Sequence, residues 1–130
     1  MKKVLFLKPS GEITLEKLPV GDWKDVTELL DGWMEIVRPM YELPRPYVLV
    51  VDEEGVLKGL PINPLASMCY GSGICGPAVI MAEGWVDGEP DLIGLTDDQI
   101  TYAIGALRRF YVDDYEPDPE EWEVLSHDRG

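Results

Sequence analysis

The sequence is poor in histidine and cysteine, the side chains that zinc sites and nucleophilic catalysis use most. It contains one histidine, His127, close to the C-terminal end, and two cysteines, Cys69 and Cys75. The five residues between the cysteines do not match the CxxC spacing of a redox pair, and no second pair completes a zinc site. We therefore predict no catalytic residues, no metal site and no cofactor, and we expect both thiols to pack as small hydrophobic side chains.

Long apolar runs are also missing. The apolar stretch nearest the N-terminus, residues 4–7, is too short for the core of a signal peptide, and no run approaches the roughly 18 residues of a membrane helix. With 45% hydrophobic and 28% charged residues among 130, the composition is that of a globular domain. We expect a cytoplasmic protein without a membrane partner.

Basic residues are scarce relative to acidic ones: 11 against 25, for a net charge of -14. Such a surface repels phosphate backbones, so direct binding of nucleic acid is not expected. The imbalance is concentrated late in the chain, where residues 83–130 hold 14 acids and 3 bases. We predict one domain over residues 1–111, followed by an acidic tail over residues 112–130. Its acids and prolines are typical of a solvated segment, whereas Tyr115 and Trp122 could fold back on the domain or bind a partner. It is interpreted as a solvated or fold-back segment, with a partner-binding arm as the alternative.

Turn residues and apolar periodicity predict the elements of the first half. Residues 4–7 and 13–18 flank a Pro-Ser-Gly-Glu turn and predict a β-hairpin. A helix capped by Asp22 and ended by Gly32 should follow, with Trp23 among its apolar residues. Two strands are then predicted at residues 33–38 and 47–51, the second forming a hairpin with residues 56–59.

Capping signals define the helices of the second half. Asn63 before Pro64 predicts the start of a short helix that ends at Gly71. Residues 76–82 should form a central strand and residues 83–94 an acidic loop, before a helix that starts with a capping box at Thr96. The predicted fold class is α+β: a mostly antiparallel sheet of about five to six strands, in the order ββαβββ–short helix–βα, with the helices on one face.

The stretch from residue 63 to residue 76 is the best candidate for a binding site. Its glycines let backbone amides approach a ligand, its hydroxyls donate hydrogen bonds, and its tyrosine offers a ring for stacking. An ordinary structural role explains the same residues, with Asn63 as a helix cap and the glycines as turn residues. The candidate ligand-binding residues, including two that could add stacking and positive charge, are Asn63, Ser67, Tyr70, Gly71, Ser72, Gly73, Trp33 and Arg38.

Short motifs in this region and around it resemble a known family. Gly59-Leu60-Pro61, with Asn63 and Ala66 downstream, is followed by Gly76-Pro77 and then by residues 94–99. This pattern is similar to the domain of unknown function 3846 family of small phage- and plasmid-borne proteins, over most of residues 3–110. The resemblance implies a small α+β domain in a mobile-element setting, here the cytoplasm of a bacterial host, with no established activity.

Two hypotheses of function follow. The first is a non-enzymatic binding protein that counters host defence by sequestering a nucleotide-derived immune signal, as a homo-oligomer. The second is an acidic inhibitor or DNA mimic that occupies the nucleic-acid-binding site of a basic host protein. The glycine-serine turn favours the first hypothesis, and the charge of residues 83–130 favours the second.

Overall fold

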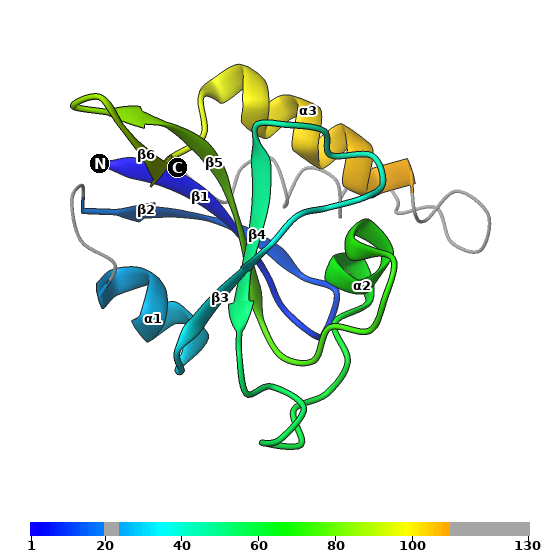
Figure 1. Cartoon of the computed structure of the whole chain (residues 1–130). Helices are drawn as coiled ribbons and strands as arrows, with labels where there is room; N and C mark the ends of the chain where they lie inside the picture. Colours follow the sequence, from blue (N-terminus) through cyan, green and yellow to red (C-terminus); the bar gives the residue numbers. More distant parts are fainter. Residues whose placement is uncertain (20–23, 110–130) are drawn as a thin grey trace.

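The computed structural model describes residues 1–19 and 24–109, and these form an antiparallel sheet with three helices (Figure 1). Five strands follow the order β2-β1-β5-β4-β3, and β6 pairs with β5. The α+β class and the mostly antiparallel sheet are confirmed. The elements are β1 (Lys2–Leu7), β2 (Ile13–Leu18), α1 (Lys24–Leu30), β3 (Met34–Val37), β4 (Tyr47–Asp52), α2 (Pro64–Tyr70), β5 (Ala78–Val86), β6 (Glu89–Ile93) and α3 (Asp97–Arg108).

Strand β5 is the centre of the sheet. Its first half pairs with β1 on one side and β4 on the other, so that Ile80 lies opposite both Leu5 and Leu49. Its second half extends beyond these neighbours and pairs with β6, from Ala82↔Ile93 to Val86↔Glu89. The first five residues of β5 and all six of β4 are buried, because these strands lie inside the sheet and are covered on both faces.

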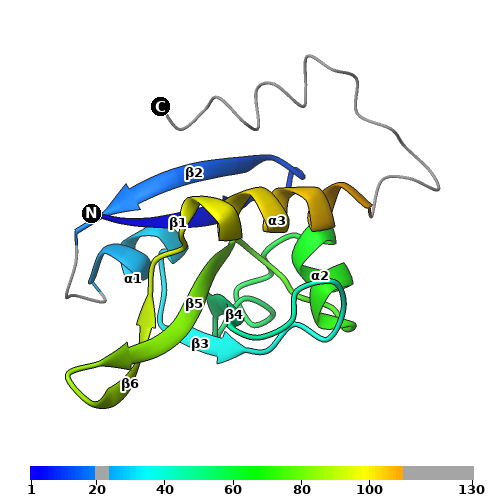
Figure 2. The ribbon, with the colours of Figure 1, turned by 90° about the horizontal axis from the view of Figure 1, so that it is seen from above.

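The helices cover both faces of the sheet, which corrects the expectation of helices on one face. Alternate residues of β4 point to opposite sides: Leu49 packs in a core with α2 and α3, whereas Val48 packs in a second core with Val26 of α1. In both ribbon views α1 and α2 lie on either side of β5 (Figures 1 and 2). The physical reason is the continuous apolar run of β4, which would leave one hydrophobic face in water if all helices packed on the other.

Residues 56–59 do not form the predicted strand. They belong to a series of turns over residues 53–59, in which the Lys58 N–H donates to the Glu54 carbonyl. The side chain of Asp52 organises these turns, because its buried carboxylate accepts from the Glu54 N–H at 2.9 Å and from Lys58 Nζ at 2.7 Å. The hairpin at this point of the chain is therefore β3–β4 instead.

The acidic stretch at residues 83–94 is a hairpin rather than a loop. Its two strands are joined at Asp87 and Gly88, which both have positive φ, of 52° and 81°. Asp-Gly is a strong signal for a two-residue hairpin turn, since glycine accepts positive φ without strain and aspartate tolerates it. The acids at positions 83, 87, 89 and 91 give this hairpin the composition of a loop.

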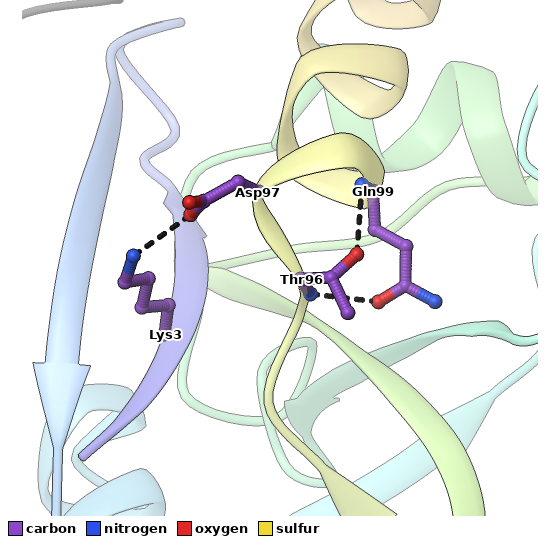
Figure 3. A network of polar contacts seen from close by, with 4 residues as sticks. All are labelled: Lys3, Thr96, Asp97 and Gln99. Atoms are coloured by element: carbon purple, nitrogen blue, oxygen red, sulfur yellow. Dashed lines mark hydrogen bonds and ion pairs between the residues drawn. The ribbon is translucent and has the colours of Figure 1, made fainter.

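Two helix ends show how local chemistry sets the boundaries. The predicted capping box of α3 is confirmed: Thr96 Oγ1 accepts from the Gln99 N–H, and Gln99 Oε1 accepts from the Thr96 N–H (Figure 3). Lys3 of β1 ties this helix start to the sheet through an ion pair of 2.7 Å with Asp97 (Figure 3). Gly32 was expected to end helix α1, but the left-handed conformation that ends it is taken one residue earlier, by Asp31 (φ 56°).

Several sequence predictions fall on positions that are not described. Asp22, Trp23 and the acidic tail at residues 112–130, with His127, lie outside the described residues. No helix within residues 1–19 and 24–109 is both long and apolar enough to cross a membrane.

Candidate functional site

Asn63 joins α2 to the sheet and to the loop that follows the helix. Its Oδ1 accepts from the Ala66 N–H at 3.1 Å, which is the predicted N-cap. Its Nδ2 donates to the carbonyls of Leu7 in β1 and Gly76 before β5, both at 3.0 Å. The residue is fully buried, so its side chain is used inside the domain and does not reach a ligand at the surface.

Ser67 and Tyr70 also face inward. The Ser67 hydroxyl accepts from the Ile74 N–H at 2.8 Å, which fixes the loop after α2 against the helix. Tyr70 is partly buried and packs against the larger core. Of the six candidate residues in this stretch, Asn63, Ser67 and Tyr70 therefore hold the loop in place, and they leave the turn at residues 71–73 to face solvent.

The turn at residues 71–73 presents free hydrogen-bond donors. Gly71 ends α2 in the left-handed conformation (φ 88°), and its N–H donates to the Ser67 carbonyl at 2.8 Å. Ser72 and Gly73 are exposed, and among the described residues neither their N–H groups nor the Ser72 hydroxyl has a hydrogen-bond partner. A ligand at this turn can accept hydrogen bonds from these groups without breaking any hydrogen bond of the fold.

Four exposed apolar residues belong to the segments that adjoin this turn, and we call them the apolar rim. Tyr41 and Ile62 lie against the turn, while Met40 precedes Tyr41 in the chain and Met68 lies on α2. The ring of Tyr41 lies over Gly71, where an added Cβ would be only 2.7 Å from Cε2, and Ile62 lies beside Gly73 at 3.9 Å from the equivalent position. The N–H groups of Met40 and Tyr41 both donate to the Cys69 carbonyl, which docks the residue 38–46 loop on the end of α2. The rim and its exposed fractions are Met40 72%, Tyr41 55%, Ile62 59% and Met68 46%.

The site is electrically neutral in a strongly acidic chain. Residues 59–82 contain no charged side chain at all. The carbonyls of Ser67 and Cys69 at the C-terminal end of α2, where the helix dipole is negative, are occupied by backbone N–H groups. The nearest acid to the rim along the chain, Glu42, forms an ion pair with Arg109. The repulsion that the net charge predicts for an anionic ligand is therefore reduced beside this uncharged segment.

The Cys69 thiol beneath the rim is chemically inert. It is fully buried, and burial, with a smaller effect of the Glu42 charge, raises its pKa to about 12. A thiol with this pKa stays protonated at neutral pH and is a poor nucleophile.

Comparisons with known proteins identify the family of this chain. The sequence profile of the family described as "Domain of unknown function (DUF3846)" matches residues 1–108. The chain belongs to this family. Among solved structures, the crystal structure of the small RNA methyltransferase HEN1 is similar, with a TM-score of 0.58 and 15% sequence identity over 85% of this chain. The chain spans 17% of the length of HEN1, so this likeness shows the fold alone. No curated protein sequence matches the chain.

The remaining two candidate residues lie elsewhere in the DUF3846 domain. Arg38, after β3, forms an ion pair with Glu83 on β5. Trp33 is exposed, and its carbonyl accepts from the Glu53 N–H at the start of the 53–59 turns. No hydrogen bond or ion pair of the described residues joins either side chain to the turn at residues 71–73.

The apolar rim is not evident from the sequence. Met40 and Tyr41 are more than 20 residues from Gly71 in the chain, and only the docking of their loop on Cys69 brings them there. One signal was available, namely the absence of charge from residues 59–82 in a chain with 28% charged residues. Within the described residues of the DUF3846 domain, no group of three histidine, cysteine or acidic side chains could hold a metal ion.

Proposed function

We propose that the DUF3846 domain is a non-catalytic binding protein whose ligand is a nucleotide-derived molecule, held by the apolar rim and the turn at residues 71–73. The observation that carries this proposal is the exposed ring of Tyr41 over Gly71, beside the unpartnered donors of Ser72 and Gly73. A ring for stacking next to backbone N–H donors is an arrangement that suits a nucleobase.

The chemistry of the turn favours contact with the base rather than with the phosphate. The turn follows the C-terminal end of α2, where the helix dipole opposes an anion. A base instead offers neutral carbonyl and ring-nitrogen acceptors to the N–H groups of Ser72 and Gly73, while its face stacks on Tyr41. The phosphates then point away from the turn toward solvent, where their charge remains hydrated.

The setting that we propose is the evasion of host defence by a mobile element. A binding protein without catalytic groups acts by occupancy, so it must remove a signalling molecule stoichiometrically rather than destroy it. The resemblance to phage- and plasmid-borne proteins motivates this role, and a homo-oligomer would raise the number of sites per particle.

Calorimetric titration with mononucleotides and cyclic dinucleotides tests the proposal. Tyr41→Ala removes the stacking surface, and we expect it to weaken binding about 5- to 150-fold, because stacking on one aromatic side chain stabilises a bound base by about 1–3 kcal/mol. Trp85→Ala is the matched control, since Trp85 is 75% exposed but lies on the second half of β5, away from the turn. If no nucleotide binds, or if both variants bind as well as the wild type, the proposal is wrong.

A second function is supported by the ribbon formed by β6 and the second half of β5. Residues 83–93 contain four acids and no base, and they also carry the exposed Trp85. The negative charge of this ribbon suits an acidic inhibitor that occupies a basic nucleic-acid-binding site on a host protein. Pull-down of basic host proteins at low and high salt tests it: capture should fall steeply with salt and should be lost in Trp85→Ala but kept in Tyr41→Ala.

A further inference from the structure

Helix α3 ends beside the apolar rim. Its last helical residue is Arg108, and the N–H of Arg109 still donates to the carbonyls of Ala106 and Leu107. The guanidinium of Arg109 pairs with the carboxylate of Glu42, which directly follows Tyr41 of the rim. Tyr102 lies earlier in α3, and its hydroxyl donates to the Glu42 carbonyl at 3.3 Å. The chain that leaves α3 therefore starts next to the rim.

The residues that follow Arg109 have the composition of a segment that binds an apolar surface. Residues 110–115 are Phe-Tyr-Val-Asp-Asp-Tyr, so four of six are aromatic or β-branched. They precede a more acidic stretch, residues 116–130, with six acids. The residues from 110 onward lie outside the described part of the chain.

The rim is too apolar to be explained as scattered surface residues. Single exposed hydrophobic side chains are normal in folded proteins, but four on the segments that adjoin one turn form a patch of the kind that is usually covered. Two of the four are methionines, which adapt to many apolar partners.

The geometry leads us to infer that residues 110–115 dock on the apolar rim in the absence of a ligand. Phe110 and Tyr111 are the first two residues after Arg109, and each residue spans up to about 3.5 Å. The connection from Arg109 to these two aromatic residues is therefore short. Such a short connection adds little loop-closure entropy, and tethering gives an effective concentration on the order of millimolar. The C-terminal segment then competes with any ligand for the same surface.

Methyl NMR of the protein without ligand tests the docking directly. The chain has five methionines: Met40 and Met68 lie on the rim, whereas Met34 and Met81 pack with the core on the other face of the sheet. We expect the Met40 and Met68 methyl resonances to shift when the chain ends at residue 109, because the aromatic rings of the segment are removed. The Met34 and Met81 resonances should stay in place, which also verifies that the shortened chain is folded.

Two further variants make the result specific. A full-length chain with Phe110→Ser, Tyr111→Ser and Tyr115→Ser should reproduce the rim shifts, and it also decides the case if the shortened chain does not fold. A chain that ends at residue 115 keeps the aromatic residues and should retain the wild-type rim resonances. Rim resonances that are identical in all chains overturn the inference, as do rim shifts that depend on protein concentration, since those indicate a second copy on the rim.

This test does not depend on the proposed nucleotide ligand. If the rim resonances shift as expected but no nucleotide binds, the docking stands and the proposed function fails. If both hold, the chain that ends at residue 109 should bind the nucleotide more tightly than the full chain, because the competing segment is gone.

Discussion

Replacement of Asn63 by alanine should be among the most damaging single changes that the described part of the domain allows. It removes one acceptor and two donors from a fully buried position, and it leaves the Ala66 N–H and the carbonyls of Leu7 and Gly76 without their partner. Loss of a helix N-cap costs about 1 kcal/mol, and each buried carbonyl left unpaired costs about 1 kcal/mol or more. We therefore expect Asn63→Ala to lower the free energy of unfolding by about 3–5 kcal/mol.

Urea unfolding followed by tryptophan fluorescence measures this loss. With an m-value of about 1.5 kcal/mol/M, the midpoint should fall by about 2–3 M at unchanged m. Asn63→Ser keeps a side-chain oxygen for the cap but neither donor, so it should recover only about 1 kcal/mol. Thr96→Ala is the control, because it removes an exposed cap without buried partners and should cost about 1 kcal/mol. If Asn63→Ala costs no more than Thr96→Ala, the two carbonyl bonds do not stabilise the fold and the reasoning is refuted.

Three other changes test separate parts of the structure. Gly71→Ala should destabilise the domain by about 1–3 kcal/mol more than Gly59→Ala in urea unfolding. Both positions have positive φ, but only at Gly71 would the added methyl group press on the Tyr41 ring. Equal costs of the two substitutions would contradict this contact. Between pH 9 and 11 the unfolded chain loses the Cys69 proton while the folded chain keeps it, because burial raises the pKa to about 12 in the folded state. Stability should therefore fall by about 1.4 kcal/mol per pH unit more in the wild type than in Cys69→Ala, and parallel pH profiles would exclude a buried thiol. Lys58→Met should lower the midpoint of thermal or urea unfolding, because it leaves its buried carboxylate partner with a single backbone donor, and an unchanged midpoint would show that this carboxylate is hydrated.

The elements that could be predicted are those whose signals are local. The capping box at Thr96, the Asn63-Pro64 start of α2 and the left-handed Gly71 each involve atoms within four residues along the chain, so the sequence contains the whole interaction. The first hairpin is of the same kind, because its turn residues lie between the two strands that they join. These four predictions are confirmed.

The predictions that were wrong concern pairing and packing between distant residues. Residues 56–59 have the apolar composition of a strand, yet the Asp52 carboxylate holds this part of the chain in turns, and β4 pairs instead with β3 and β5. The second face of the sheet, with α1 packed on it, depends on where β4 lies in the strand order, which local signals do not specify.

The sequence by itself determined the class of the domain, its three helices and its neutral segment at residues 59–82. Each of these follows from composition or from interactions between near neighbours in the chain. Only the tertiary structure decided which residues of the candidate stretch face solvent, because burial depends on what packs against a side chain. In the fold, the buried Asn63 side chain bonds to three separate backbone groups, of Leu7, Ala66 and Gly76. Tyr41, 30 residues before Gly71 in the chain, lies over that glycine because the N–H groups of Met40 and Tyr41 both donate to the Cys69 carbonyl. A surface built in this way depends on contacts between distant segments, and no local pattern in the chain records them.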